Sequence, residues 1–132
     1  MPFVDLVALL ALLQFFVFSA LVGQARGRYG VKAPAVAGHE MFERAYRVQM
    51  NTLELLMLFI PGLYIAARYW PPTAVAALGA VYLFGRLLYR RAYMAAPATR
   101  SAGFVVSIVP CVALLAAGAV GALRAAFGAL PG

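Results

Sequence analysis

Four polar side chains lie on one face of a predicted helix, and their chemistry suits a small zwitterionic ligand. They are Glu43, Arg47, Asn51 and Glu54, and residues spaced three or four apart share one side of an α-helix. Arg47 could bind a carboxylate through two parallel hydrogen bonds, while Glu54 could accept from an ammonium and Asn51 from an amide. The same row could instead hold neighbouring helices together, and the residues alone leave both interpretations open.

A second group of candidates lies near the start of the last predicted helix. Tyr89 and Tyr93 are four residues apart and share a helix face with Arg86 beside them. An interfacial belt of tyrosines with extended arginines is the alternative interpretation of that face. Arg100 is expected in the first turn of the last helix, where the helix dipole disfavours a cation. Its position therefore indicates that an anion binds beside it.

Other kinds of site find little support in the sequence. Cys111 is the only cysteine and His39 the only histidine, which excludes an internal disulfide and a multi-cysteine metal site. Phosphate loops, nucleophile–base triads and zinc motifs have characteristic spacings, and none occurs in this sequence. We therefore expect no metal at the site.

The composition indicates that a membrane protein positions these residues. The chain has 132 residues, of which 65% are hydrophobic and 11% charged, whereas soluble domains have about 25% charged residues. The formal net charge is +7, but nucleic-acid binding needs a basic patch on a folded domain. Here the basic residues separate long apolar stretches. We expect membrane lipids as neighbours and no nucleic-acid partner.

Four stretches lack charged side chains, at residues 6–25, 55–67, 69–85 and 101–123. A membrane-spanning helix needs about 20 mainly apolar residues, so the second helix must begin in the polar segment before residue 55. We predict an all-α integral membrane four-helix bundle forming one domain over residues 1–132. Its helices are expected at about 3–25, 41–68, 72–95 and 98–126.

The basic residues are concentrated around two of the three connections between these helices. Basic residues mark the cytoplasmic side of membrane proteins, so we expect both connections in the cytoplasm and both termini outside. The strong preference for arginine over lysine indicates a GC-rich bacterium and hence its inner membrane. The basic residues concerned are Arg26, Arg28 and Lys32 around the first connection, and Arg86, Arg90, Arg91 and Arg100 around the third.

The segment from Phe42 to Glu54 resembles the signature of the MAPEG family, the membrane-associated proteins in eicosanoid and glutathione metabolism. The resemblance includes residues 24–31 and continues through residues 81–89 to Tyr93 and Arg100. It covers nearly the whole chain. It is strongest to bacterial-type members near the branch that contains leukotriene C synthase and the microsomal glutathione transferases.

This resemblance implies a homotrimer of four-helix subunits with a glutathione site at each subunit interface. Glutathione would be the co-substrate, and Arg100 would be the catalytic residue beside its thiol. The other implied ligands form two sets, namely Arg47, Asn51, Glu54, Tyr89 and Tyr93 from one subunit, and Arg26 and Gln49 from its neighbour.

The implied activity is that of a membrane-embedded glutathione transferase, with peroxide reduction as a further activity. The thiolate would attack a hydrophobic electrophile that enters from the lipid. Leu55 and Gly27 depart from the tyrosine and arginine that the mammalian leukotriene-forming members carry, so the electrophile stays open.

Two other functions remain as alternatives. One is a non-catalytic membrane scaffold that binds lipid or glutathione. The other is a small four-helix exporter. Such exporters use an acidic residue in the middle of the first helix to couple protons, whereas Asp5 lies near the end of the first helix here.

Overall fold

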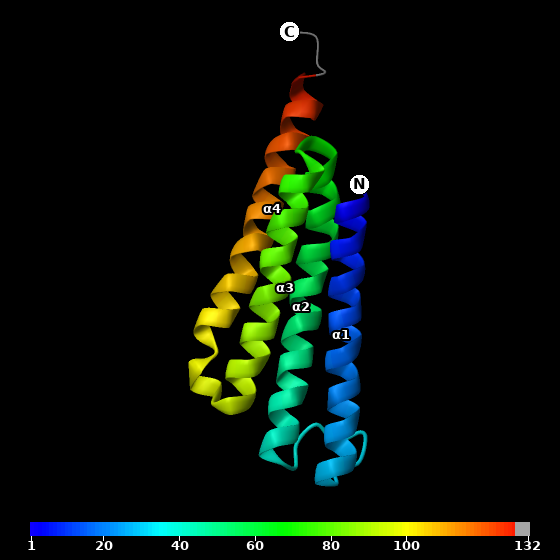
Figure 1. Cartoon of the computed structure of the whole chain (residues 1–132), viewed down its shortest axis with the longest axis vertical. Coiled ribbons are helices and arrows are strands. Elements are labelled where there is room, and N and C mark those ends of the chain that lie inside the picture. The colour runs from blue at the N-terminus through cyan, green and yellow to red at the C-terminus, as the bar shows by residue number, and fades with distance from the viewer. Residues whose placement is uncertain (129–132) are drawn as a thin grey trace.

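The computed structural model describes residues 1–128, so residues 129–132 of the predicted domain lie outside the described part. The helices are α1 (Pro2–Tyr29), α2 (Glu40–Tyr69), α3 (Pro72–Ala95) and α4 (Ser101–Gly128), with the short 3-10 helix η1 (Pro97–Thr99) between α3 and α4. The four long helices lie side by side, with the N-terminus and the end of α4 toward one end of the bundle (Figure 1). The connections α1–α2 and α3–α4 lie toward the other end. The predicted all-α four-helix bundle is confirmed.

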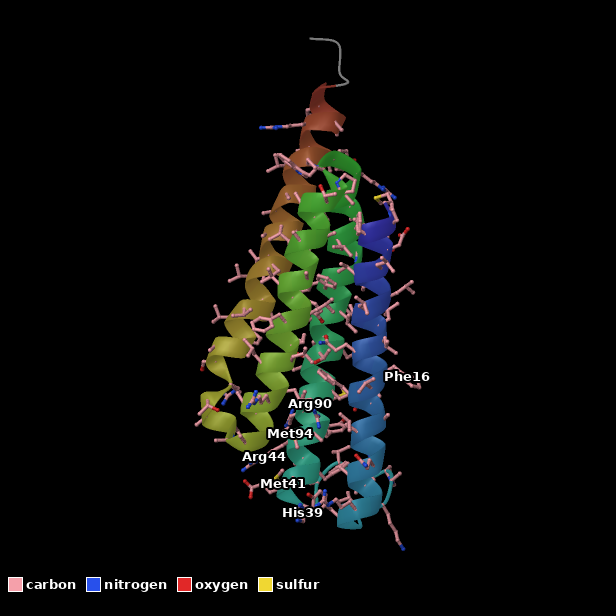
Figure 2. All side chains as sticks on the ribbon, in the orientation of Figure 1. Phe16, His39, Met41, Arg44, Arg90 and Met94 are labelled. Atoms are coloured by element: carbon pink, nitrogen blue, oxygen red, sulfur yellow. The ribbon has the colours of Figure 1, made fainter. Side chains whose placement is uncertain are left out.

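Each of the four helices could cross a bilayer. They contain between 24 and 30 residues and are apolar enough to qualify as membrane spans. Even the shortest is about 36 Å long, compared with a hydrocarbon core of about 30 Å. The outer face of α1 carries large exposed apolar side chains such as Phe16, which is 69% exposed and points away from the bundle (Figure 2). Such a face suits contact with lipid.

α2 and α3 form the centre of the bundle, and each packs against both α1 and α4. The ring of Phe59 in α2 stacks on Tyr82 in α3, with 3.9 Å between ring centroids. Val4 and Leu114 are fully buried in the same core, which joins α1 and α4 to the central pair. On the α3–α4 side, Gly85 is essential to the contact, because a Cβ there would lie 2.7 Å from the backbone nitrogen of Ser107.

The ends of two helices differ from the sequence expectation. α1 continues to Tyr29, so Arg26 lies in its last turn rather than in the loop. A cation there interacts favourably with the negative end of the helix dipole, and Gly30 ends the helix with φ at 68°. α4 begins at Ser101, and its first hydrogen bond runs from the Phe104 nitrogen to the Arg100 carbonyl, at 3.0 Å. Arg100 therefore immediately precedes α4 instead of lying in its first turn.

The end of α3 is held by a side chain from α2. Arg44 donates from Nη1 to the carbonyls of Met94 and Ala95, at 2.9 and 3.2 Å, and it also pairs with Glu40 one turn before it. The last carbonyls of a helix have no partner within that helix. Arg44 therefore satisfies the end of α3, and Figure 2 shows it near Met94 at this end of the bundle.

Candidate functional site

A polar cavity of about 340 Å³ opens between α2, α3 and the residue that precedes α4. It brings together six of the eight residues predicted to form the site. Only Met50 among its lining residues was not predicted. The lining residues are Arg47, Met50, Asn51, Glu54, Tyr89, Tyr93 and Arg100.

The α2 part of the cavity follows from the amphipathic pattern of that helix. Arg47 and Glu54 are exposed on the cavity side, while Val48 and Leu55 face the interior and are 0% and 5% exposed. Apolar residues anchor one face of the helix, so the opposite face presents its polar groups. Asn51 lies between the two charged residues and is half-buried.

Two tyrosines form the α3 wall of the cavity. Tyr89 is buried and Tyr93 half-buried, and their ring centroids are 5.6 Å apart. The guanidinium of Arg86 lies over the Tyr89 ring, 4.3 Å from its centroid. This contact favours one orientation of the Tyr89 ring, because a cation is attracted to an aromatic face.

Arg100 borders this cavity and a second one. The second cavity has a volume of about 470 Å³ and shares Asn51, Tyr89 and Arg100 with the first, but its other lining residues are Ser101, Phe104 and Val105. Arg100 is exposed and donates from Nη1 to the Pro97 carbonyl at 2.8 Å. The first N–H groups of α4 have no helical partner. The guanidinium and the helix start therefore both make this place electropositive.

The charged residues of the α2 row do not hold the helices of this chain together, whereas Asn51 in the same row accepts from Arg86 of α3. Within residues 1–128, neither Arg47 nor Glu54 forms an ion pair or a side-chain hydrogen bond. Glu43, the first member of the row, lies outside the cavity and accepts a long hydrogen bond of 3.5 Å from the Gly38 nitrogen. Arg47 and Glu54 are thus free to bind a ligand or another protein chain.

The burial of Arg86 is the feature that the sequence interpretation missed. Arg86 was expected in the helix at 72–95 beside Tyr89 and among the basic residues around the third connection, but it is 0% exposed inside α3. Its Nε donates to Ser107 Oγ at 2.9 Å, and its Nη1 donates to Asn51 Oδ1 at 2.7 Å. The signal for its burial was its spacing from Tyr89, because residues three apart share a helix face.

Arg26 and Gln49 do not reach the cavity of their own chain. Gln49 donates to Ser19 Oγ of α1 at 3.0 Å. Arg26 donates to the Ala35 carbonyl at 2.7 Å and lies over the Phe42 ring. Neither residue lines the cavity between α2 and α3.

The remaining candidate residues have local structural contacts. His39 caps α2 by accepting from the Met41 nitrogen at 3.1 Å, and its ring stacks on Tyr29. Asp5 accepts from the Tyr64 hydroxyl at 2.8 Å near the start of α1, which is not the mid-helix position of a proton-coupling acid. In the part of the chain that the structure describes, no group of three or more His, Cys, Asp or Glu side chains could hold a metal.

Comparisons with known proteins identify a family and several similar chains. A family model described as the MAPEG family matches residues 4–120. An uncharacterized protein of Synechocystis sp. is 46% identical over 118 residues, covering 89% of this chain and 83% of that protein. Human microsomal glutathione S-transferase 2 is 38% identical over 115 residues, covering 87% and 78%. Leukotriene C4 synthase of Cavia porcellus is 38% identical over 117 residues, covering 89% and 78%.

Proposed function

The chain belongs to the MAPEG family and is an integral multi-pass membrane protein, and we propose that it is a glutathione transferase. Its similarity to a microsomal glutathione S-transferase and a leukotriene C4 synthase supports a glutathione-related transferase function in general. The observation that carries the specific proposal is the single cavity that gathers Arg47, Asn51, Glu54, Tyr89, Tyr93 and Arg100.

The cavity matches glutathione in charge and size. Glutathione carries two carboxylates, one ammonium and two amides. The cavity offers two guanidinium groups, from Arg47 and Arg100, and one carboxylate, from Glu54. Two-pronged arginine–carboxylate pairs are among the strongest polar contacts in proteins. Its volume of about 340 Å³ falls within the usual range of about 300–1,000 Å³ for small-ligand sites.

Arg100 would act on the glutathione thiol by electrostatics. The thiolate is the nucleophile, and a free cysteine thiol has a pKa near 8.5, which nearby cations or a helix N-terminus lower to about 3.5–7.5. Arg100 and the start of α4 supply both. A guanidinium stays protonated at neutral pH and cannot act as a general base, so its role is to stabilise negative charge.

The second cavity suits the hydrophobic co-substrate. It shares Arg100 with the polar cavity but adds the apolar side chains of Phe104 and Val105. Val105 is 52% exposed on the surface that would face lipid, so an electrophile could enter sideways from the membrane. The thiolate sulfur would form a bond to the electrophilic carbon, and the leaving group would depart with its electron pair. With a peroxide, attack on oxygen would release an alcohol and glutathione sulfenic acid, which a second glutathione converts to the disulfide and water.

We propose a homotrimer in which a neighbouring subunit closes the cavity. Glu54 is exposed in the single chain, although it lies about 21 Å along α2 from its start, at the usual helical rise of about 1.5 Å per residue. An ionisable side chain at membrane depth is costly against lipid and normally faces protein or water. Arg26 and Gln49 of the neighbour would complete the site, as the family resemblance implies.

We propose that the end of the bundle with the α1–α2 and α3–α4 connections faces the cytoplasm of a bacterial inner membrane. Arg91, Arg100 and Lys32 lie toward this end, and basic residues favour the cytoplasmic side. This orientation would place the glutathione cavity toward the cytoplasmic side of the membrane, where the cell supplies glutathione.

The test is the ultraviolet absorbance of the thiolate when glutathione is added to purified protein in detergent. We expect a thiolate signal at neutral pH in the wild type, its loss in Arg100→Ala, and its retention in Arg91→Ala. Arg91 is a matched control because it is an exposed arginine outside both cavities. Equal thiolate signals in the wild type and Arg100→Ala would show that Arg100 does not stabilise the thiolate. Glutathione binding without turnover of any electrophile in a broad panel would favour the scaffold.

A further inference from the structure

Arg86 lies at the centre of a buried polar network that joins α3 to α2 and α4. It is fully buried, and within residues 1–128 it forms no ion pair. Besides Ser107 and Asn51, it contacts Thr52, whose Oγ1 lies 3.3 Å from Nη1. A buried charge is costly unless hydrogen bonds compensate for it. The bonds of Arg86 are made by Nε and Nη1, while Nη2 has no partner among the described residues, so loss of the Asn51 contact would leave the charge still less compensated.

The direction of each hydrogen bond in the network is determined by chemistry. Ser107 Oγ donates to the Gly103 carbonyl at 2.7 Å, and Thr52 Oγ1 donates to the Val48 carbonyl at 2.8 Å. Both hydroxyls therefore accept from Arg86. A guanidinium has donors and no acceptor, so the Asn51 atom that faces Nη1 must be the carbonyl oxygen.

The orientation of the Asn51 amide follows from this contact. Its Oδ1 points to Arg86 in the bundle interior at 2.7 Å, while Asn51 also lines both cavities. The amide nitrogen has no hydrogen-bond partner among the described residues. Since the two amide atoms point in different directions from one carbon, the nitrogen is the atom left to face the ligand. This reverses the expectation that Asn51 accepts from an amide.

We propose that Arg86 is a positioning residue that holds Asn51 with its amide nitrogen toward the cavity, so that Asn51 recognises an acceptor oxygen of glutathione. The acceptor is a carboxylate or a peptide carbonyl. The inference rests on the proposed glutathione site and specifies the polarity of one of its contacts. Without Arg86, the Asn51 amide could rotate and present either atom.

The experiment measures glutathione binding by calorimetry, and steady-state kinetics with an aryl halide, for the full-length protein in detergent. Arg86→Gln should weaken binding about tenfold, the usual effect of losing one hydrogen bond to a charged group. The rate at saturating glutathione should stay within about twofold, because Arg100 is unchanged and the loss is one of uniform binding. Arg90→Gln is the matched control. Arg90 lies one turn further along α3, contacts the Phe18 ring and lines neither cavity. The Arg90→Gln variant should therefore bind glutathione with wild-type affinity.

Asn51→Asp provides a second measurement that does not depend on losing Arg86. An aspartate keeps an oxygen for Nη1 of Arg86, so that hydrogen bond is retained, but it presents an acceptor to the cavity in place of a donor. We expect it to bind glutathione at least tenfold more weakly while unfolding no more readily than the wild type. If Asn51→Asp binds glutathione with wild-type affinity, the Asn51 side chain does not donate to glutathione. If a folded Arg86→Gln variant binds glutathione with wild-type affinity, Arg86 does not position Asn51. If the wild type itself binds no glutathione, the proposed function fails and this inference fails with it.

Discussion

Gly103 of α4 lies against the backbone of Tyr89 in α3, since a Cβ at residue 103 would be 2.4 Å from the Tyr89 nitrogen and 2.5 Å from its Cα. Such distances are far inside van der Waals contact, so only glycine permits this approach of the two helices. The contact occurs next to the site. Tyr89 lines both cavities, and Arg100 lies three residues before Gly103.

Gly103→Ala should therefore disturb both stability and binding. The added methyl group must push α3 and α4 apart, and overpacking of this kind costs about 1–3 kcal/mol. We expect a lower thermal unfolding temperature and weaker glutathione binding, because Tyr89 and Arg100 would separate. Gly23→Ala is the control, since nothing lies within 4 Å of a Cβ there, and it should be neutral or slightly stabilising. Unchanged binding in Gly103→Ala would mean that the site does not depend on this contact.

Glu54→Gln should reveal whether this carboxylate binds the ammonium of glutathione. Loss of a charge-assisted contact should weaken glutathione binding about tenfold or more. N-acetylglutathione lacks the ammonium, so it should bind the wild type and the variant with similar affinities. Glu43→Gln is the matched control, because Glu43 lies on the same helix outside the cavity. If the variant discriminates between the two ligands as the wild type does, Glu54 binds another group.

The defect of Arg100→Ala should shrink as the pH rises. In the wild type, the bound thiol should have a depressed pKa and be ionised at neutral pH. Without Arg100, the thiol should return toward its ordinary pKa near 8.5, so it is mostly protonated at pH 7 and ionised above about pH 9. The ratio of wild-type to variant rates should therefore fall between these values. A ratio that stays constant across this range would show that Arg100 acts on another step.

Mixed oligomers should distinguish a site within one chain from a site shared by two. In the proposed trimer, Arg100 comes from one subunit and Arg26 from its neighbour, so both single alanine variants should be impaired. Co-assembly in equal amounts should restore about one quarter of the sites, because each mixed cyclic trimer contains one interface with both residues intact. Native mass spectrometry would verify the trimer. No recovery in mixed trimers would place Arg26 outside the site.

Arg44→Met should destabilise the protein without abolishing catalysis. The variant loses the two bonds that Arg44 donates to the carbonyls of Met94 and Ala95, which would leave the end of α3 without these partners. We expect a cost of about 1–2 kcal/mol from the lost hydrogen bonds, measured by thermal unfolding in detergent. Arg91→Met should have a smaller effect because Arg91 is exposed.

The sequence by itself determined the membrane-spanning character and the identity of most cavity residues. Long apolar stretches have few alternatives to membrane helices, and the helical repeat places Arg47, Asn51 and Glu54 on one face whatever packs against it. The family resemblance also implied that Tyr89, Tyr93 and Arg100 belong to the same site, and all three line the cavity. These inferences depend on helical periodicity and on a family motif, and both are properties of the sequence alone.

Only the tertiary structure decided which atoms these residues present to a ligand. Arg86 resembles any basic residue near a helix end, and its burial depends on Ser107 from α4 and Asn51 from α2 meeting it in the core. The direction of the Asn51 amide, with Oδ1 toward Arg86, follows from that contact rather than from the neighbours of Asn51 in sequence. Likewise, the contact between Gly103 and Tyr89 depends on the distance between two helix axes. Both the Asn51 orientation and the Gly103–Tyr89 contact depend on packing between helices. The periodicity along a single helix does not encode that packing.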